Sequence, residues 1–256
     1  MKKWAIILGG SSGIGLATAK KLGKHGYNLI IAHRDRRSDL DQINAHFNAI
    51  RESSVSVEAF NFDATNEAKI AEHINQIKDL VGQDQIAVFV HAISRGNLKP
   101  LIGNPRLTLQ DLSLTIDAMA LSLQLWVNQL TDASLLTDGS TIVTLSSAGS
   151  EKIWPGYAAV GMAKSTLETL SKYLAVELAK KNIRVVCVKA GITDTPSLKM
   201  IPGYDQLKTY ATTRNPSGRM TLPEDVANAI YILTLPEAKW ITGSIIHVDG
   251  GEHLIG

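Results

Sequence analysis

Short apolar runs alternate along the chain with longer segments in which apolar residues recur every three or four positions. The short runs predict β-strands, and the longer segments predict amphipathic helices. Strands are expected at residues 5–8, 28–32, 55–61, 86–91, 141–146, 184–189 and 244–248. Helices are expected between them, at residues 14–25, 39–52, 67–80, 108–128, 157–180 and 223–234. This alternation is typical of βαβ units and predicts an α/β fold, a single doubly wound parallel sheet with helices on both faces.

One late segment, residues 196–221, breaks the regular alternation. It contains the structure-breaking residues Pro196, Pro202, Gly203, Pro216 and Gly218. Long insertions after a late strand are usually functional, so we expect a substrate lid here. No internal repeat, low-complexity tract or linker divides the sequence, and residues 1–256 are expected to form a single domain.

The composition narrows the class of partner. Of the 256 residues, 45% are hydrophobic and 20% are charged, and the formal net charge is +2. Because no polybasic run is present, neither nucleic acid nor a membrane surface is expected as a partner. No stretch approaches membrane-spanning length, and the single cysteine, Cys187, lies in an apolar run. We therefore expect a soluble cytoplasmic protein without disulfides, and no metal site is expected.

A glycine-rich turn follows the first predicted strand and opens the first predicted helix. Glycines let the backbone approach a pyrophosphate closely, and the start of a helix offers free N–H groups and the positive end of its dipole. In this position the turn predicts a dinucleotide site in a Rossmann fold. The residues expected to hold the cofactor here are Gly9, Ser11, Ser12, Gly13, Ile14 and Gly15.

The end of the second strand bears on which dinucleotide binds. Cofactors without a 2′-phosphate are usually held there by an acidic side chain. By strand length that position is His33, and Arg34 follows it. Guanidinium groups pair well with phosphate, so the sequence favours NADPH over NADH as the cofactor. Asp35 is close enough that a one-residue change of register would reverse this preference.

The third strand ends in a candidate adenine contact. Asp63 and Ala64 follow residues 55–61 after one intervening residue, Phe62. A carboxylate at this position is expected to accept a hydrogen bond from the adenine amino group. The alternative is that Asp63 is a strand-end and cap residue, a common role for aspartate.

Tyr157 and Lys164 stand seven positions apart in a predicted helix. A step of seven returns to nearly the same helix face about 10 Å along the axis, so both polar ends are able to reach one cleft. In a chain that opens with a nucleotide loop, the pair suggests hydride chemistry. In isolation it equally fits an amphipathic helix with a half-buried tyrosine and a snorkelling lysine.

Taken together, these segments resemble the short-chain dehydrogenase/reductase superfamily over essentially the full chain. The supporting segments are Gly9–Gly15, Asp63, Val90–Ile93, Ser146-Ser147, the Tyr157/Lys164 helix, Ala190–Thr195 and the tail 242–251. The resemblance implies that Lys164 and the strand end at His91, Ala92 and Ile93 contact the ribose of the nicotinamide. It implies that the carboxamide side is held by Gly191, Ile192, Thr193 and Thr195.

Within the superfamily the chain is most similar to bacterial enoyl-acyl-carrier-protein reductases, particularly the NADPH-using kind. Ketoreductases carry their tyrosine four residues before the lysine, where this chain has Val160. The run 90–93, Val-His-Ala-Ile, is similar to the Val-His-Ser-Ile of enoyl reductases, whereas ketoreductases usually have Asn-Asn-Ala-Gly.

Three positions depart from the family pattern. Asp117 stands where the superfamily often has an asparagine, and Ala190 replaces a proline before Gly191. Ser147 stands where many enoyl reductases carry a second aromatic hydroxyl, and it also fits the serine of the ordinary ketoreductase pattern. Ser147 is therefore either a hydrogen-bonding assistant or a strand-end residue.

The resemblance implies reduction of the C=C bond of a trans-2-enoyl thioester. This substrate is a small acyl thioester, and acyl carrier protein is an expected carrier for it. Hydride goes to the β-carbon, and Tyr157 donates to the thioester oxygen, where negative charge develops in the transition state. The resemblance also implies a homotetramer. Candidate residues for an apolar acyl slot are Trp154, Leu198, Met200, Ile201, Tyr204 and Leu207.

Two other readings remain open at this point. One keeps the fold and makes the chain a carbonyl reductase or alcohol dehydrogenase with a displaced tyrosine. The other is a nucleotide-binding scaffold that has lost catalysis, which the departures at Asp117 and Ala190 suggest. Retention of both Tyr157 and Lys164 argues against this last reading.

Overall fold

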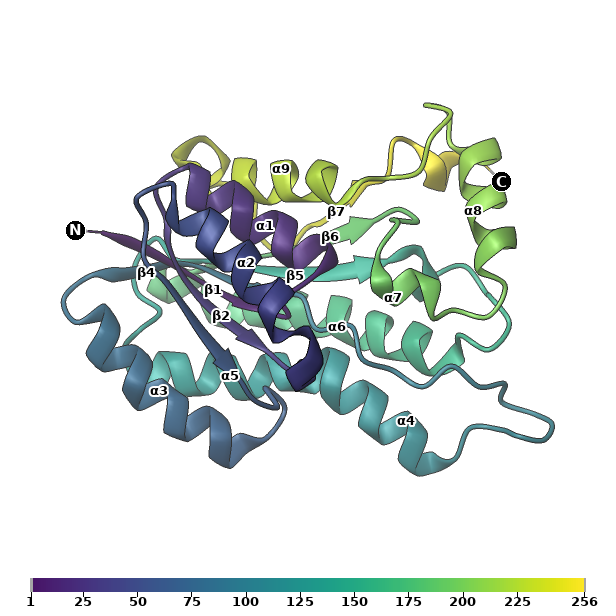
Figure 1. Ribbon diagram of the computed structural model, residues 1–256, viewed down its shortest axis with the longest axis horizontal. Coiled ribbons are helices and arrows are strands. Elements are labelled where there is room, and N and C mark those ends of the chain that lie inside the picture. The colour runs from purple at the N-terminus through teal and green to yellow at the C-terminus, as the bar shows by residue number, and fades with distance from the viewer. Residues whose placement is uncertain (1, 256) are drawn as a thin grey trace.

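The computed structural model describes residues 2–255 and places all the described strands in one sheet (Figure 1). The strands are β1 (Lys3–Leu8), β2 (Asn28–His33), β3 (Val57–Asn61), β4 (Gln85–His91), β5 (Thr141–Ser147), β6 (Arg184–Ala190) and β7 (Ile245–Val248). Their order across the sheet is β3-β2-β1-β4-β5-β6-β7, and every neighbouring pair is parallel. The predicted doubly wound α/β fold is confirmed.

Helices cover both faces of this sheet (Figure 1). One face carries α1 (Gly13–Lys24), α2 (Leu40–Arg51) and α9 (Pro223–Leu233). The other carries α3 (Glu67–Val81), α5 (Ser122–Asp132) and α6 (Ala158–Glu177), with α4 (Leu109–Ile116) packed beside α6. The short helices α7 (Pro196–Lys199) and α8 (Tyr204–Arg214) stand beyond the carboxyl ends of the strands.

The central strands are buried on both faces because helices cover the two sides of the sheet. In β1, Ile6 and Leu8 pack toward α3, α5 and α6, whereas Ala5 and Ile7 pack toward α1, α2 and α9. Alternate side chains of a strand point to opposite faces, so a strand covered on both sides needs an apolar residue at every position. This requirement explains the continuous apolar runs in the sequence.

The strand order produces a crevice between β1 and β4, at the carboxyl ends of the strands. From β1 the chain winds outward to β2 and β3, then crosses back to β4 on the other side of β1. The loops that follow β1 and β4 therefore leave the sheet in different directions. In open α/β sheets, ligands bind at this switch point, outside the carboxyl ends of the strands.

The helix predicted over residues 108–128 is interrupted. α4 ends at Ile116, a π-helical turn spans Asp117–Leu121, and α5 begins at Ser122. π turns within helices are frequent at functional sites. Met119 from this turn lines the cleft described below, whereas the Asp117 side chain is exposed.

The irregular segment 196–221 contains α7 and α8. Leu198, Leu207 and Met220 of this segment form a small apolar cluster against Trp154 and neighbouring residues. The segment thus has its own packing, and its proposed movement as a lid stays a prediction. Among the residues that the structure describes, no helix is long and apolar enough to span a bilayer.

Candidate active site

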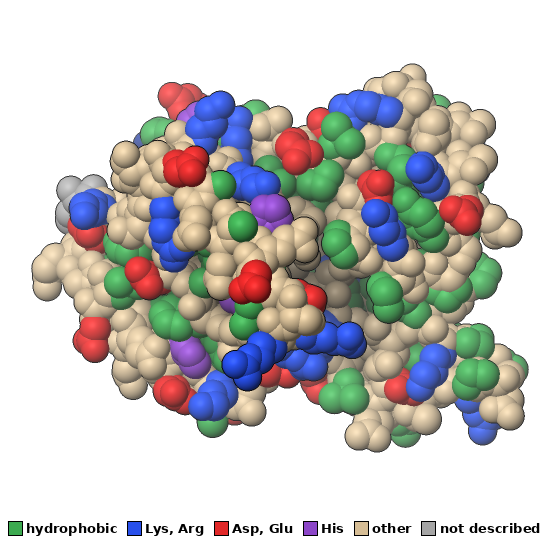
Figure 2. Space-filling view, viewed as in Figure 1, with side chains coloured by type: hydrophobic (Ala, Val, Ile, Leu, Met, Phe, Trp, Pro, Cys, Tyr) green, Lys and Arg blue, Asp and Glu red, His purple; other side chains and the backbone are tan. Residues whose placement is uncertain are grey.

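A cleft of about 1050 Å³ lies at the carboxyl ends of the strands. The space-filling view shows the hollow between the part that carries α1 and α2 and the part that carries α7 and α8, with basic side chains gathered at its rim (Figure 2). All of the residues expected for catalysis or cofactor binding except His91 line this cleft. Segments far apart in the sequence are therefore brought to one place.

The glycine turn makes one wall of the cleft, and its backbone is packed too closely for side chains. A Cβ on Gly9 would lie 2.7 Å from the Ala92 carbonyl oxygen, and a Cβ on Gly15 would lie 2.1 Å from the Gly9 oxygen. Gly9 also has a φ of +80°, a region that favours glycine. Ser12 precedes α1 without capping it through its side chain, so the first N–H groups of the helix remain available to an anion.

Charged side chains at the ends of β2 and β3 pair with one another. Arg34 Nη1 lies 2.6 Å from Asp63 Oδ2, and Arg95 Nη1 lies 2.8 Å from the same oxygen. Asp35 Oδ2 lies 2.8 Å from His33 Nδ1, and Asp35 lines the cleft. The sequence analysis assigned the cofactor contact to His33 and Arg34 and did not assign Asp35, although it noted how close that residue is.

Among the residues expected for catalysis or cofactor binding, His91 alone does not line the cleft. Its ring is buried beneath the end of β4, where Nε2 lies 2.8 Å from the Ser122 hydroxyl oxygen. That hydroxyl donates to the Ala118 carbonyl, so Nε2 carries the proton and donates to Ser122. Burial and the nearby Lys164 charge lower the pKa of His91 to about 3, and the ring is neutral. Its backbone neighbours Ala92 and Ile93 do line the cleft.

Tyr157 lies immediately before the first residue of α6 and packs its ring against the backbone of Gly149. A Cβ on Gly149 would come within 2.3 Å of Tyr157 Cε1, so this contact requires a glycine. Burial raises the pKa of Tyr157, an effect that the nearby Ser147 hydroxyl partly opposes. The buried Ser147 oxygen has no hydrogen-bond partner of good geometry within the described chain. Two hydroxyl groups thus face one part of the cleft, and Ser147 is left to bind a ligand.

Lys164 lies two turns along α6 and is also buried. Its Nζ donates to the Leu145 carbonyl oxygen at 2.6 Å. Burial lowers the pKa of Lys164 to about 8, although the Glu168 carboxylate acts in the opposite direction. Val160, at the position where many related reductases carry their tyrosine, packs in an apolar cluster with Met119 and Ala163. This face of α6 therefore offers one phenol and one amine, both in the cleft.

An ion network in which Lys189 is buried and Glu151 is exposed lies behind Lys164. Lys189 of β6, only 2% exposed, places its Nζ 3.0 Å from the Glu168 carboxylate and 2.5 Å from that of Glu151. Ser146 of β5 donates to the same Glu168 oxygen at 2.5 Å. Sequence reasoning missed this network because the three charged residues come from separate segments.

The loop after β6 closes the nicotinamide side of the predicted site. The Ile192 N–H donates to the Glu252 carboxylate at 3.2 Å, and the Thr193 hydroxyl donates to the Gly191 carbonyl at 2.8 Å. Thr195 and Glu252 also line the cleft. Burial raises the pKa of Glu252. Glu252 was not identified from the sequence, since it lies sixty residues from its partner.

The far part of the cleft is apolar. Five of the six residues expected for an acyl slot line it, namely Trp154, Leu198, Met200, Ile201 and Leu207. The sixth, Tyr204, packs against the Leu198 cluster instead, and its hydroxyl donates to Asp194. The geometry thus offers a charged and glycine-rich end for a dinucleotide and an apolar end for a hydrocarbon chain.

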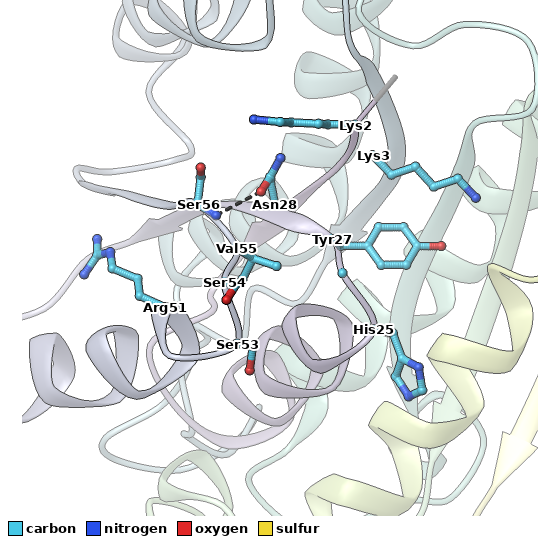
Figure 3. Close-up of a pocket in the computed structure, with 11 residues that line it drawn as sticks. Lys2, Lys3, His25, Tyr27, Asn28, Arg51, Ser53, Ser54, Val55 and Ser56 are labelled. Atoms are coloured by element: carbon cyan, nitrogen blue, oxygen red, sulfur yellow. Dashed lines mark hydrogen bonds between the residues drawn. The ribbon is translucent and has the colours of Figure 1, made fainter.

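A second depression lies at the opposite, amino ends of β1 and β2 (Figure 3). Asn28 accepts from the Ser56 N–H there, and the side chains of Lys2 and Lys3 extend in opposite directions. Most of its lining residues are exposed, and its basic groups do not converge on one point. We assign no chemistry to this depression.

The lowered pKa of Lys164 makes stability depend on pH. Between about 8, its folded value, and 10.5, its ordinary value, the unfolded chain binds a proton that the folded chain does not, so stability rises with pH. The comparison is the free energy of unfolding of the unsubstituted chain minus that of Lys164→Met. We expect this difference to increase by about 2 kcal/mol between pH 7 and pH 10. Urea unfolding at both pH values measures this difference.

Lys172→Met is the matched control, because Lys172 is an exposed residue of the same helix. The free energy of unfolding of Lys172→Met is expected to differ from that of the unsubstituted chain by the same amount at both pH values. An equally constant difference for Lys164→Met would contradict the burial of a titrating amine.

Comparison with known proteins identifies the family. A family model described as Enoyl-(Acyl carrier protein) reductase matches residues 9–253. The enoyl-[acyl-carrier-protein] reductase [NADH] FabI of Enterococcus faecalis is 34% identical over 237 residues, which are 92% of this chain and 90% of that protein. The FabI protein of Bacillus subtilis is 34% identical over 195 residues, 75% of this chain and 73% of its own.

A solved structure agrees with these sequence relatives. The crystal structure of the enoyl-[acyl-carrier-protein] reductase (NADH) from Aquifex aeolicus superposes with a TM-score of 0.87 at 26% identity. The match covers 99% of this chain and 97% of that one. Sequence and structure therefore point to the same family.

These relatives contradict the expected preference for NADPH, since their names specify NADH. The structure gives a physical reason why the sequence inference was wrong. The Arg34 guanidinium already pairs with Asp63, so it is not a free partner for a 2′-phosphate. Asp35 supplies a carboxylate at the same edge of the cleft.

The expected resemblance is confirmed over nearly the whole length, from the glycine turn at Gly9 to His253. A family model, two curated relatives and a superposable crystal structure all agree. The chain belongs to the enoyl-(acyl carrier protein) reductase family of the short-chain dehydrogenase/reductase superfamily.

Proposed function

We propose that the chain catalyses the NADH-dependent reduction of the C=C bond of a trans-2-enoyl thioester. The observation that carries the proposal is the position of Tyr157. Its phenol stands at the start of α6 against Gly149, seven residues before the buried Lys164, while Val160 packs among apolar side chains. Membership of the enoyl reductase family and the names of the relatives support the same reaction.

When bound, NADH would supply a hydride to the β-carbon of the substrate, and a proton that reaches the α-carbon from water or a relay would complete the reduction. As the hydride arrives, negative charge develops on the thioester oxygen, and a preorganised donor at that oxygen lowers the barrier. Tyr157 is the proposed donor. Because burial raises its pKa, the phenol keeps its proton at neutral pH and is able to donate. The unpartnered Ser147 hydroxyl is a second donor on the same side of the cleft.

Lys164 is proposed to position the cofactor. An ammonium group has three donors, and the Leu145 carbonyl takes one of them. The remaining donors are available to the ribose hydroxyls of the nicotinamide. The positive charge also favours the developing anion near the phenol.

The remaining cofactor contacts are proposed for the residues that line the rest of the cleft. The turn from Gly9 to Gly15 and the start of α1 take the pyrophosphate. Asp35 beside His33 is proposed to accept from the adenosine ribose, and Asp63 with Ala64 lies at the adenine. Ala92 and Ile93, which line the cleft, are proposed to contact the nicotinamide ribose, and Gly191, Ile192, Thr193 and Thr195 are proposed to contact the carboxamide.

An acyl carrier protein is the proposed carrier of the thioester, and a cytoplasmic homotetramer is the proposed assembly. Exposed apolar residues on α6 and the π turn support the assembly, namely Leu121, Met162, Tyr173 and Val176. Other leucines of α5 and α6 pack inward, since Leu174 belongs to the core and Leu125 and Leu170 are partly buried against it.

A direct comparison of substrates tests the proposed reaction. Oxidation of NADH is measured with crotonyl-CoA, an enoyl thioester, and with acetoacetyl-CoA, a 3-ketoacyl thioester. We expect kcat/KM to be at least about 10-fold higher with crotonyl-CoA, and a similar preference for NADH over NADPH. Turnover of the ketoacyl thioester alone would favour a carbonyl reductase, which Ser147 suits, and cofactor binding without any turnover would favour a scaffold.

The role of Tyr157 is tested by two variants that act on the same phenol. Tyr157→Phe removes the hydroxyl, and Gly149→Ala introduces a Cβ where the ring now lies. Both are expected to lower kcat by about 100-fold or more while NADH binding stays within about threefold. Tyr173→Phe, which changes an exposed tyrosine of the same helix, is the control. Unchanged kcat in Tyr157→Phe would remove this residue from the mechanism.

A further inference from the structure

Three side chains with metal-binding atoms converge where β7 ends. Asp249 Oδ2 lies 2.7 Å from His253 Nδ1 and 3.8 Å from His247 Nδ1, and all three atoms lie within 4.8 Å of one another. The two imidazole rings stack with their centroids 3.9 Å apart and their planes 24° from parallel. Both Nδ1 atoms are therefore held on the same side as the carboxylate.

The backbone fixes the carboxylate in this position. Asp249 is buried, and its oxygens accept from the N–H groups of Gly251 and His253, each at 3.0 Å. The two histidine side chains are about one third exposed or less, at 28% for His247 and 33% for His253. The cluster thus combines a rigid carboxylate with a path from solvent.

One atom of the cluster has no partner in the fold itself. His247 Nδ1 is buried and makes no hydrogen bond within the described chain. The bonds from the Gly251 and His253 N–H groups to Asp249 explain why Asp249 and His253 meet, but they do not involve His247. This nitrogen, the Asp249 carboxylate and the second imidazole are all groups of the kinds that bind metal ions.

The separations between the three ligand atoms are close to those around a zinc ion, which binds both nitrogen and oxygen ligands. Bonds from zinc to nitrogen and oxygen of about 2.0–2.2 Å in a tetrahedron separate neighbouring ligands by roughly 3.3–3.5 Å. The two measured separations of 2.7 and 3.8 Å lie on either side of that range. An ion would replace the hydrogen bond between His253 Nδ1 and Asp249, and a neutral His253 would then carry its proton on Nε2.

We propose that His247, Asp249 and His253 bind one divalent transition-metal ion of the zinc class, with water completing the coordination. No metal site was expected from the sequence. Asp249 also packs against Gly191, where an added Cβ would lie 2.8 Å from the Asp249 Cβ. The ion would therefore brace the loop that begins at Gly191, without taking part in hydride transfer.

Zinc binding to the intact, tag-free chain tests this proposal after treatment with a chelator and dialysis. Titration calorimetry with ZnCl2 is expected to show one equivalent per chain, and saturating zinc is expected to raise the Tm by a few degrees. Cobalt(II) in place of zinc is expected to give the visible absorption bands of a tetrahedral nitrogen and oxygen site. Magnesium is not expected to compete.

Two variants and one control locate the site. His247→Asn and His253→Asn are each expected to weaken zinc binding by about 100-fold or more, because each removes one of three protein ligands. His25→Asn, an exposed histidine that stacks on Tyr231 far from the cluster, is expected to bind zinc unchanged. Absence of saturable binding in the unsubstituted chain, or equal binding in all four proteins, would overturn the proposal. Because these readouts do not use turnover, they are independent of the proposed reaction.

Discussion

The placement of the candidate site depends on how α6 is bonded to the sheet. Three inward positions of the helix carry polar groups that bond to β5 or β6. Lys164 donates to the Leu145 carbonyl, Glu168 pairs with Lys189, and Ser171 bonds to Thr144 at 2.9 Å. Positions 164, 168 and 171 follow helical periodicity, so all three lie on one face.

These buried bonds fix the helix in register as well as in orientation. Apolar contacts alone tolerate small shifts, whereas a buried charge that loses its partner costs about 3–5 kcal/mol. A helix held in this way cannot slide along the sheet without breaking all three contacts. The phenol at its first turn is therefore held at a defined height above the end of β5.

Close backbone contacts set the other walls of the cleft. Gly9 and Gly15 pack against carbonyl groups at the pyrophosphate end, and Gly149 packs against the tyrosine ring. Gly149 lies far from Gly9 and Gly15 in the sequence. At all three positions the missing side chain leaves space that a ligand or a reactive group needs. The same fold thereby combines a dense core with a cleft of about 1050 Å³.

Much of this arrangement was predictable from the sequence because it depends on local pattern. The strands, the glycine turn and the spacing of Tyr157 and Lys164 are all features of short segments. The sequence did not predict the π turn at Asp117–Leu121, since a π turn changes only one step of the helical period. Nor did it place His91, whose ring turns inward while its backbone neighbours face the cleft.

The errors arose where residues from separate segments meet. The sequence suggested that Arg34 binds a phosphate. In the structure Arg34 pairs with Asp63, which lies 29 residues away in the sequence. Glu252 at Ile192 and the Lys189 network are pairings of the same kind, with no signal in any single segment. Charged side chains are assigned from a sequence least securely because their partners decide their roles.

The bond that accepts the hydride is the central claim, and isotope transfer tests it most directly. NADH carrying deuterium at the transferring C4 position is mixed with the enzyme and crotonyl-CoA, and the product is analysed by NMR and mass spectrometry. The account predicts a saturated thioester with deuterium on the β-carbon. Deuterium found only on the carbinol carbon of a product formed from a ketone, with none delivered to crotonyl-CoA, would contradict it.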